Sequence, residues 1–328
     1  MNIILKLTDR CNNDCQYCYD KTNRNRFGDI DRTVLDHLIQ LINMEDKVNL
    51  VFHGGEPLLY GYEAFNDLVH TLKNLNTEVT MSVQTNGLLL DDKWAYLFLA
   101  DNISCSTSVD FKKGRKLELT LDKLKHYADM GLNLGVISVI TNENICHMID
   151  MYIDLIKSGV NSVAFNTVYD TDNPLDVDLH YKEFSKFYKF LNSRACARER
   201  NYLTYMCRYL GMESNLQCSP DNCRYNWLTI TPNGNLYPCD RPSMLNYGLG
   251  NLLDYRSLND IINTDKYLNY VNSTVKLQTE HCLNCEINTF CRTGCLCNHN
   301  LLDSKINTYE CAYASNYYRI IENLIKGE

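Results

Sequence analysis

Three cysteines near the amino terminus are spaced for metal chemistry. Cys11, Cys15 and Cys18 form a C-x3-C-x2-C pattern in the stretch CNNDCQYCYD. Three thiolates can bind three irons of a 4Fe–4S cluster and leave the fourth iron open for a small molecule. An open coordination position separates a reactive metal site from a structural one. The alternative is a zinc knuckle whose fourth ligand lies elsewhere in the chain.

These cysteines follow a predicted strand, and short β-rich runs then alternate with amphipathic helical patterns up to about residue 170. The expected helices are 32–42, 64–75, 93–100, 119–130 and 145–159, and the expected strands are 2–8, 48–52, 78–85, 103–109, 135–141 and 162–168. Such alternation favours a parallel sheet with right-handed crossovers that curls into a barrel. An eight-stranded barrel needs about 250 residues. The sequence therefore predicts an α/β fold with a partial (β/α)6 barrel, and the cysteines lie at the carboxyl edge of its strands.

The pattern changes further along the chain. A helix is expected over 179–195, and beyond residue 200 the strand–helix alternation is lost while cysteines become frequent. Few long apolar runs remain there, so metal is expected to supply much of the folding energy. We therefore expect a barrel domain over 1–200 and a cysteine-rich domain over 201–328.

Composition restricts the class of protein. The chain has 328 residues, a formal net charge of −8 and 16 cysteines. The negative charge argues against nucleic-acid and anionic-membrane partners. No apolar run reaches the roughly 18 residues that span a bilayer, and the start has no secretory signal. We expect a soluble cytoplasmic protein, in which so many cysteines indicate metal rather than disulfides.

The first cysteine motif, with an aromatic residue (Tyr17) before its last cysteine, resembles the cluster motif of radical S-adenosylmethionine enzymes. In that family the fourth iron chelates the amino and carboxylate groups of S-adenosylmethionine. Electron transfer from the cluster then yields a 5′-deoxyadenosyl radical. The resemblance implies S-adenosyl-L-methionine as a cofactor and a six-stranded partial barrel as the fold.

Other strand ends carry further matches to this family. The stretch FHGGEPLL resembles its Gly-Gly-Glu-Pro segment, where glycines let the backbone approach a ligand closely. QTNG and STSVD end the third and fourth expected strands, and Asn-Gly and Ser-x-Asp also serve as plain turn residues. The residues that the resemblance places at the cofactor are Tyr17, Gly54, Gly55, Glu56, Pro57, Asn86 and Ser108, with Asp110 completing the Ser-x-Asp element.

The carboxyl-terminal cysteines have ordered spacings too. They form C-x10-G-x4-C around Gly234, then C-x2-C-x5-C-x3-C, then a final Cys311. This resembles the SPASM extension of radical enzymes that modify peptides and proteins, which implies two auxiliary 4Fe–4S clusters and three clusters in all. The implied ligands are Cys223, Cys239 and Cys295, with Cys218 favoured over Cys207 as the fourth, for one cluster, and Cys282, Cys285, Cys291 and Cys311 for the other. The default for Cys105, Cys146, Cys196, Cys207 and Cys297 is an ordinary small core residue.

Asp240 directly follows Cys239. In sulfatase-maturing relatives an aspartate at the matching position is the base that deprotonates the substrate. A partly desolvated carboxylate near a cluster would have the raised pKa that suits this role. The alternative is a turn residue before Arg241 and Pro242.

Three departures from the family pattern affect the functional hypothesis. The segment after Asp110 is short and lacks the usual glycine, and Asp20 stands where sulfatase maturases carry a tyrosine. The first expected strand begins at residue 2, so we expect the barrel, the carboxyl-terminal domain or a separate peptide-recognition protein to hold the substrate.

The sequence therefore indicates a radical S-adenosylmethionine enzyme that modifies a side chain of a ribosomally synthesised precursor peptide or a protein, with a C–C or C–S cross-link as the favoured product. The runner-up is an anaerobic sulfatase maturase that oxidises cysteine or serine to formylglycine. An iron–sulfur electron carrier or a zinc-held binding module is the alternative of another class. The expected reducing partner is a flavodoxin or ferredoxin.

Overall fold

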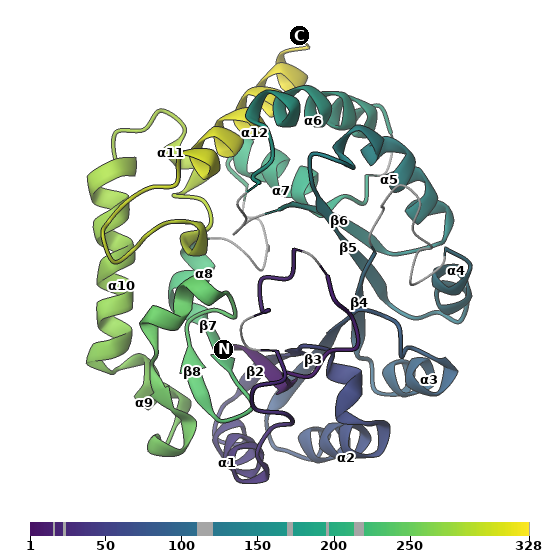
Figure 1. The fold of residues 1–328 in the computed structure, drawn as a ribbon, viewed down its shortest axis with the longest axis vertical. Helices are drawn as coiled ribbons and strands as arrows, with labels where there is room; N and C mark the ends of the chain where they lie inside the picture. The colour runs from purple at the N-terminus through teal and green to yellow at the C-terminus, as the bar shows by residue number, and fades with distance from the viewer. Residues whose placement is uncertain are drawn as a thin grey trace. The chain divides into compact units, whose positions relative to one another are not determined.

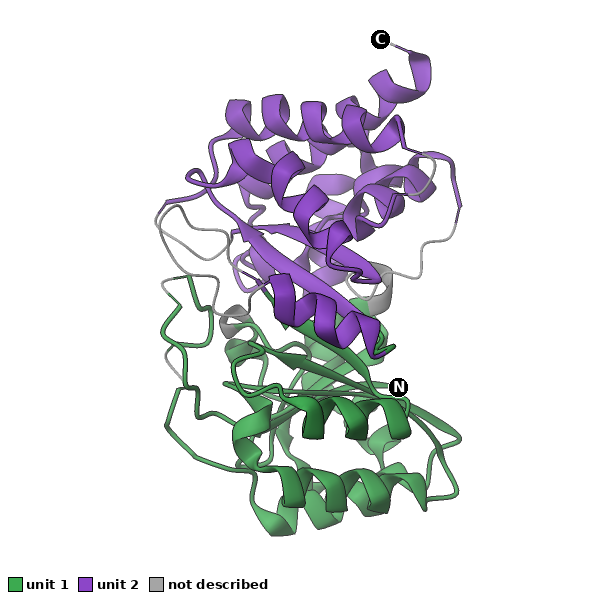
Figure 2. Ribbon diagram, turned by 90° about the vertical axis from the view of Figure 1, so that its right-hand side faces the viewer, with its two compact units in different colours: residues 1–108, 131–133, 223–272 green, residues 109–130, 134–222, 273–328 purple. Residues whose placement is uncertain are grey.

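The computed structural model describes residues 1–15, 17–21, 24–109, 121–168, 173–194, 197–212 and 220–327. The chain divides into two compact units, and each unit draws on separate stretches of sequence (Figure 2). The first unit comprises Met1–Ser108, Gly131–Asn133 and Cys223–Asn272. The second comprises Val109–Met130, Leu134–Asn222 and Ser273–Glu328.

The first unit contains a sheet built mainly of parallel strands. Its first four strands are β1 (Asn2–Thr8), β2 (Lys47–Gly54), β3 (Glu78–Thr85) and β4 (Ser104–Ser108). On its other edge β1 pairs in parallel with β7 (Trp227–Ile230), a strand from far along the chain. The antiparallel strands β8 (Asn235–Tyr237) and β9 (Gly250–Asn251) follow, so the order in this unit is β4-β3-β2-β1-β7-β8-β9.

Apolar alternation explains why β1 lies in the middle of this sheet. Ile3, Leu5 and Leu7 are fully buried, and Leu5 lies opposite Phe52 of β2 and Ile230 of β7. Side chains of one strand alternate between the two faces, so Lys6 belongs to the opposite face from these three residues.

Three helices cover these strands on one side (Figure 1): α1 (Arg32–Ile42), α2 (Tyr62–Lys73) and α3 (Asp92–Ala100). The Asp31 side chain accepts a hydrogen bond from the Thr33 backbone N–H, and Asp91 accepts one from Trp94. Side-chain acceptors of this kind satisfy the free N–H groups at the start of a helix. These caps therefore fix where the first and third helices begin.

The second unit pairs β5 (Leu134–Ile140) in parallel with β6 (Ser162–Thr167). Its helices are α4 (Leu121–Asp129), α5 (Met148–Lys157), α6 (Val177–Asn192), α7 (Arg200–Tyr209), α11 (Asn288–Cys291) and α12 (Thr308–Lys326). Aromatic rings form the core between α6, α7 and α12. Tyr317 stacks on Tyr205 with ring centroids 4.3 Å apart and meets Phe184 edge-on at 5.2 Å.

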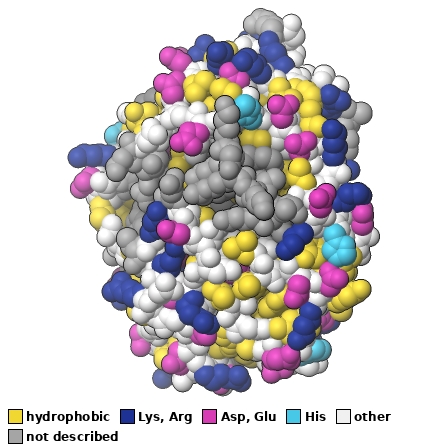
Figure 3. Space-filling view, turned by 45° about the vertical axis from the view of Figure 1, so that its right-hand side comes forward, with side chains coloured by type: hydrophobic (Ala, Val, Ile, Leu, Met, Phe, Trp, Pro, Cys, Tyr) yellow, Lys and Arg dark blue, Asp and Glu magenta, His cyan; other side chains and the backbone are white. Residues whose placement is uncertain are grey.

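The chain passes from the second unit to the first within α8 (Pro220–Asn226) and back again within α10 (Asp265–Leu277), whereas α9 (Leu258–Ile262) belongs to the first unit. Among the residues described, no helix combines the length and apolar character needed to cross a bilayer. On the face drawn in Figure 3, positive and negative side chains are interspersed rather than gathered into patches of one sign.

The six predicted strands are confirmed, and those over 2–8 and 78–85 match β1 and β3 to the residue. The helix expected over 179–195 corresponds to α6. Beyond residue 200 no strand is named among the expected elements, and the structure adds the hairpin of β7 and β8 over 227–237. β7 has only four residues, too short for an apolar pattern to identify.

Candidate functional site

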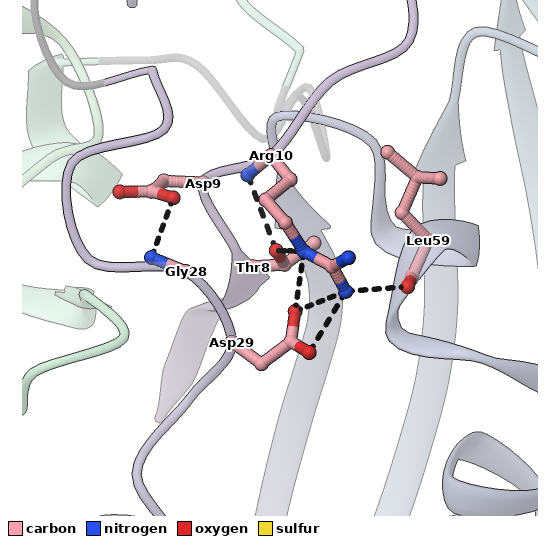
Figure 4. A network of polar contacts seen from close by, with 6 residues as sticks. All are labelled: Thr8, Asp9, Arg10, Gly28, Asp29 and Leu59. Atoms are coloured by element: carbon pink, nitrogen blue, oxygen red, sulfur yellow. Dashed lines mark hydrogen bonds and ion pairs between the residues drawn. The ribbon is translucent and has the colours of Figure 1, made fainter.

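The loop after β1 is closed at its base by polar contacts (Figure 4). The buried Asp9 carboxylate accepts hydrogen bonds from the backbone N–H groups of Arg26 at 2.8 Å and Gly28 at 2.9 Å. The Nη2 of Arg10 donates hydrogen bonds to both carboxylate oxygens of Asp29, at 2.7 and 2.8 Å. The same nitrogen also donates to the Leu59 carbonyl oxygen at 2.9 Å. These contacts hold both ends of the loop that carries the first three cysteines.

Cys11, Cys15 and Cys18 are all half-buried in this loop. The Cys18 backbone N–H donates to the Cys15 carbonyl at 3.2 Å. Burial raises the pKa of the Cys11 thiol, with further contributions from Glu56 and Cys18 that Asn13 and Arg24 oppose. The Arg24 side chain hydrogen-bonds the Cys18 sulfur and pairs with Asp14 at 3.0 Å. The loop thus collects three thiols and a cation that favours the thiolate form of Cys11.

The two glycines after β2 allow close contact with this cysteine loop. Gly54 has φ +141°, and a Cβ there would lie 2.0 Å from the Thr8 carbonyl oxygen. A Cβ on Gly55 would lie 2.3 Å from the Arg10 carbonyl oxygen. The Gly55 N–H donates to Thr8 at 2.9 Å. Both glycines are therefore needed because the backbone just before the first cysteine passes too close for a side chain.

Glu56 ties the end of β2 to the end of β3. Its fully buried carboxylate accepts from Leu58 N–H at 3.1 Å, the Thr85 hydroxyl at 2.6 Å and Asn86 N–H at 2.7 Å. Burial raises the pKa of Glu56 although these three donors oppose the shift. The Asn86 side chain in turn donates to Asn12 at 2.8 Å and lies 3.9 Å from the Cys11 sulfur. The predicted residues of the second and third strand ends thus converge on Cys11.

The remaining predicted cofactor residues lie at the same edge. Pro57 starts a short 3-10 helix that ends at Tyr60, and Tyr17 is half-buried. Ser108 at the end of β4 is exposed and accepts a hydrogen bond from Gln84 at 3.2 Å. Asp110, the other half of the Ser-x-Asp element, lies outside the described residues.

Asp240 lies beside the cysteine loop because β7 and β8 extend the sheet past β1. It accepts a short hydrogen bond from the hydroxyl of Tyr19, the neighbour of Cys18. Its second oxygen lies 3.4 Å from the Cys239 sulfur. The raised pKa expected for Asp240 is wrong. Burial raises it, but His53, Lys6, Tyr19 and Arg241 together outweigh burial and leave the pKa below its usual range.

Two further polar groups lie near Asp240. Lys6 pairs with Asp20 at 2.8 Å, and their side chains are only 4% and 10% exposed. Burial lowers the pKa of His53, whose Nδ1 has no hydrogen-bond partner. In the sequence, only the lysine inside the apolar stretch NIILKLT indicates that the second face of β1 carries a polar site. The pairings with Tyr19 and Asp20 had no signal in the sequence.

Four carboxyl-terminal cysteines gather in the second unit: Cys282, Cys285, Cys291 and Cys311. Burial raises the pKa of Cys291 to about 12, and Glu310, Cys311 and Cys282 add to the rise while Arg208 opposes it. Burial likewise raises the pKa of Cys311, with contributions from Cys282, Glu310 and Cys285. Because these four thiols affect one another's pKa values, they lie near one another in the second unit.

The other predicted auxiliary ligands are divided between the units. Half-buried Cys223 and Cys239 belong to the first unit and Cys295 to the second, while Cys218 lies outside the described residues. Within the described ranges no three His, Cys, Asp or Glu side chains are spaced to hold a single metal ion. In a four-iron cluster each thiolate binds its own iron, so its ligands need not converge on one point.

The cysteines without a predicted ligand role differ in burial. Cys105 is a core residue as expected, and burial raises its pKa to about 12. Cys207 and Cys297 are half-buried. The core assignment is wrong for Cys146, which is exposed in the short 3-10 helix Ile145–His147 that precedes α5. Cys196 lies outside the described residues.

Two family models match the chain. One, described as the radical SAM superfamily, matches residues 5–155. The other, an iron–sulfur cluster-binding domain named SPASM, matches residues 218–286. Residues 5–155 thus form a radical SAM domain, and residues 218–286 form a SPASM domain. The protein is therefore an enzyme, and S-adenosylmethionine and 4Fe–4S clusters are the cofactors of these two domains.

Similar proteins include maturing enzymes. The cysteine-type anaerobic sulfatase-maturating enzyme of Clostridium perfringens (strain 13 / Type A) is 24% identical over 96% of this chain and 94% of its own length. The solved structure of native anSMEcpe with bound AdoMet and Cp18Cys peptide has a TM-score of 0.83, 20% identity and coverage of 99% of both chains. The crystal structure of Streptococcus suis SuiB bound to precursor peptide SuiA has a TM-score of 0.65 and 13% identity, and the match covers 94% of this chain and 75% of the SuiB chain. The predicted fold class is confirmed.

The thiols fit the cofactors of these domains. Three part-buried thiols lie at one strand end beside a cation. Four more thiols gather in the second unit. Thiolates are the ligands that iron–sulfur clusters take in proteins. The donor chemistry therefore suits a cluster at each place.

Proposed function

We propose that this enzyme abstracts a hydrogen atom from a side chain of a peptide or protein substrate, with Cys11, Cys15 and Cys18 as ligands of the reactive cluster. S-adenosylmethionine bound to such a cluster supplies a 5′-deoxyadenosyl radical. The observation that carries the proposal is the convergence of Glu56, Asn86 and the cysteine loop at one strand edge. In this arrangement Glu56 positions the backbone of the second and third strand ends, and Asn86 positions Cys11.

Asp240 acts in this proposal as the base that takes a proton from the substrate. Its carboxylate is oriented by the Tyr19 hydroxyl next to Cys18, which holds a proton acceptor beside the reactive thiols. The oxidation is balanced when the substrate loses a hydrogen atom to the radical, a proton to Asp240 and one electron to an auxiliary cluster. A flavodoxin or ferredoxin supplies the electron that starts the cycle.

Oxidation of a cysteine or serine side chain is the product that this geometry favours. That reaction requires a thiol or hydroxyl proton to be removed next to the carbon radical, and in this proposal Asp240 accepts it. The similarity to a sulfatase-maturating enzyme along nearly the whole chain supports the same choice.

A cross-link in a ribosomally synthesised peptide is the second candidate. The observation in its favour is the buried Lys6–Asp20 pair, because Asp20 stands where sulfatase maturases carry a tyrosine. A different polar group at this position gives the substrate a different environment.

The reactive site is tested by replacing Cys11, Cys15 and Cys18 together with alanine. With three four-iron clusters the reconstituted enzyme holds about twelve irons, and the triple variant about eight. The variant should form no 5′-deoxyadenosine from S-adenosylmethionine and dithionite, whereas Cys105→Ala should form it normally. Continued cofactor cleavage by the triple variant contradicts the assignment.

The product is tested with cysteine- and serine-containing peptides. A hydrazide probe that captures aldehydes labels formylglycine, whereas a cross-linked peptide loses two hydrogens and stays unlabelled. Labelling supports side-chain oxidation, and a linked, unlabelled product supports the second candidate.

A further inference from the structure

Arg208 is a buried cation without full pairing. It lies in the last turn of α7 and is only 9% exposed, yet its Nε and Nη2 have no hydrogen-bond partner. A guanidinium stays charged at any pH that proteins encounter. A buried charge is costly unless an opposite charge or acceptors compensate it. Arg208 therefore indicates that an anionic group belongs beside it.

The packing of α7 shows where that group lies. Tyr205, one turn before Arg208, stacks on Phe290 with centroids 5.5 Å apart and on Tyr317 of α12 at 4.3 Å. Phe290 directly precedes Cys291, and α12 carries Cys311 in its first turn. The face of α7 that holds Tyr205 and Arg208 thus packs against the segments that supply two of the four gathered thiols. The Arg208 charge also acts on Cys291, where it opposes the rise in pKa that burial causes.

Glu310, an acidic side chain whose charge also acts on Cys291, is already engaged. Glu310 accepts the Cys295 backbone N–H at 2.9 Å with one carboxylate oxygen and the Asn298 amide at 2.7 Å with the other. Among the described residues no ion pair joins Arg208 to a carboxylate. The anionic group that remains is the one the thiols themselves would hold.

We propose that Arg208 is a positioning residue that sets the reduction potential of the auxiliary cluster held by Cys282, Cys285, Cys291 and Cys311. The inference rests on the proposed assignment of that cluster. A 4Fe–4S cluster with four thiolate ligands is an anion, and reduction by one electron adds a further negative charge without breaking a bond. A buried positive charge nearby stabilises the reduced form more than the oxidised form, and hydrogen bonds to cluster sulfur act in the same direction. Arg208 therefore raises the midpoint potential and makes this cluster the better electron acceptor.

The test is a potentiometric titration followed by electron paramagnetic resonance. It uses the iron-loaded triple variant of Cys11, Cys15 and Cys18, in which only the auxiliary clusters give signals, with dithionite as reductant. Arg208→Gln should make reduction of one auxiliary cluster at least tenfold less favourable, a fall of about 59 mV or more in a one-electron couple. Arg208→Lys keeps the charge and should shift the potential less. Arg319→Gln is the matched control, because this exposed arginine of the same unit lies over the Tyr181 ring.

A second measurement does not depend on how well the variants fold. In protein labelled with ¹⁵N-guanidino arginine, pulsed resonance of the reduced auxiliary clusters should show coupling to ¹⁵N, which Arg208→Lys should abolish. Unchanged potentials in Arg208→Gln, or no ¹⁵N coupling in the parent protein, overturn the inference. Failure of the proposed cluster itself is distinguishable, because Cys282→Ala would then leave the iron content unchanged.

Discussion

At the scale of single residues, the proposed reaction depends most on Asp240. Asp240 is held by Tyr19, and it shares its surroundings with His53 and the buried Lys6–Asp20 pair. Four neighbours that lower its pKa compete with burial, which raises it. The carboxylate is therefore stabilised in its ionised form, in contrast to the raised pKa that its position beside a cysteine motif suggested.

Asp240→Asn tests the base directly. The amide has nearly the same shape but cannot accept the proton, so the variant should bind iron and form 5′-deoxyadenosine normally. Product should fall by about a hundredfold or more, the contribution of a positioned base. The measurement is the ratio of modified peptide to 5′-deoxyadenosine. Asp265→Asn is the control, because Asp265 is an exposed residue in the first turn of α10. An unchanged ratio would show that Asp240 is only a turn residue.

At the scale of secondary structure, the sequence predicts the barrel strands well and the hairpin poorly. β1 is found from a nearly continuous apolar run, which is typical of a covered parallel strand, and β3 from the alternation of Val79, Met81 and Val83 with polar residues. β7 and β8 are short, and their pairing with β1 is a long-range contact. The stretch TPNGN between them contains an Asn-Gly pair, which is a strong hairpin signal. The position of Asp240 follows from this hairpin, and a motif match alone cannot supply it.

Gly234 is the residue on which the hairpin depends. It has φ +82°, and a Cβ there would lie 2.9 Å from both Asn251 and Val34. Gly234→Ala should lower the free energy of unfolding by about 1–3 kcal/mol from strain, plus the cost of crowding. Gly61→Ala is the matched control, because Gly61 has φ +97° with nothing within 4 Å of its Cβ position. Urea unfolding of the two variants separates crowding from strain, and equal losses would contradict the close packing.

Glu199 makes the stability of the second unit depend on pH. This fully buried residue caps α7, accepting from Tyr202 N–H at 2.6 Å and from Phe165 N–H of β6 at 3.0 Å. Burial raises its pKa to about 7, although these donors oppose the shift. The native state then binds more protons than the unfolded state between the ordinary pKa and pH 7, so stability falls as pH rises through this range.

The loss between pH 6 and pH 8 should be about 1 kcal/mol for this single group. Glu199→Gln cannot ionise, so its urea midpoint should change less over the same range than that of the parent enzyme. Parallel pH profiles for parent and variant would show that Glu199 is ionised throughout.

At the scale of the whole molecule, apolar packing is distributed unevenly along the chain. The first unit has a continuous apolar core, whereas the segment from Gln278 to Asn307 contains short helical turns and few buried apolar side chains, among them Phe290, Leu296 and Leu301. Short segments of this kind are stabilised by metal ligation in many small domains. That metal supplies folding energy in this segment stays a prediction from the cysteine spacing, whereas the structure shows which unit each described cysteine joins.

Cys282→Ala and Cys311→Ala should therefore each lose about four irons and much of their soluble yield. Cys105→Ala removes only a small buried side chain and should keep both. Anaerobic reconstitution with iron analysis compares the three variants side by side. Equal iron contents and yields would remove the structural argument for a cluster in this segment.

The pairing of β1 with β7 has a consequence for how the chain is made. The Tyr19–Asp240 contact spans 221 positions in sequence, and β1 meets its second neighbour at residue 227. While the ribosome synthesises the intervening chain, one edge of the first strand has no partner, and an unpaired edge can join a strand of another nascent chain. A contact order this high also slows folding, because a long loop must close before the pairing gives any stability. The pairing that brings Asp240 to the cysteine loop thus prolongs the period in which newly made protein is prone to aggregate.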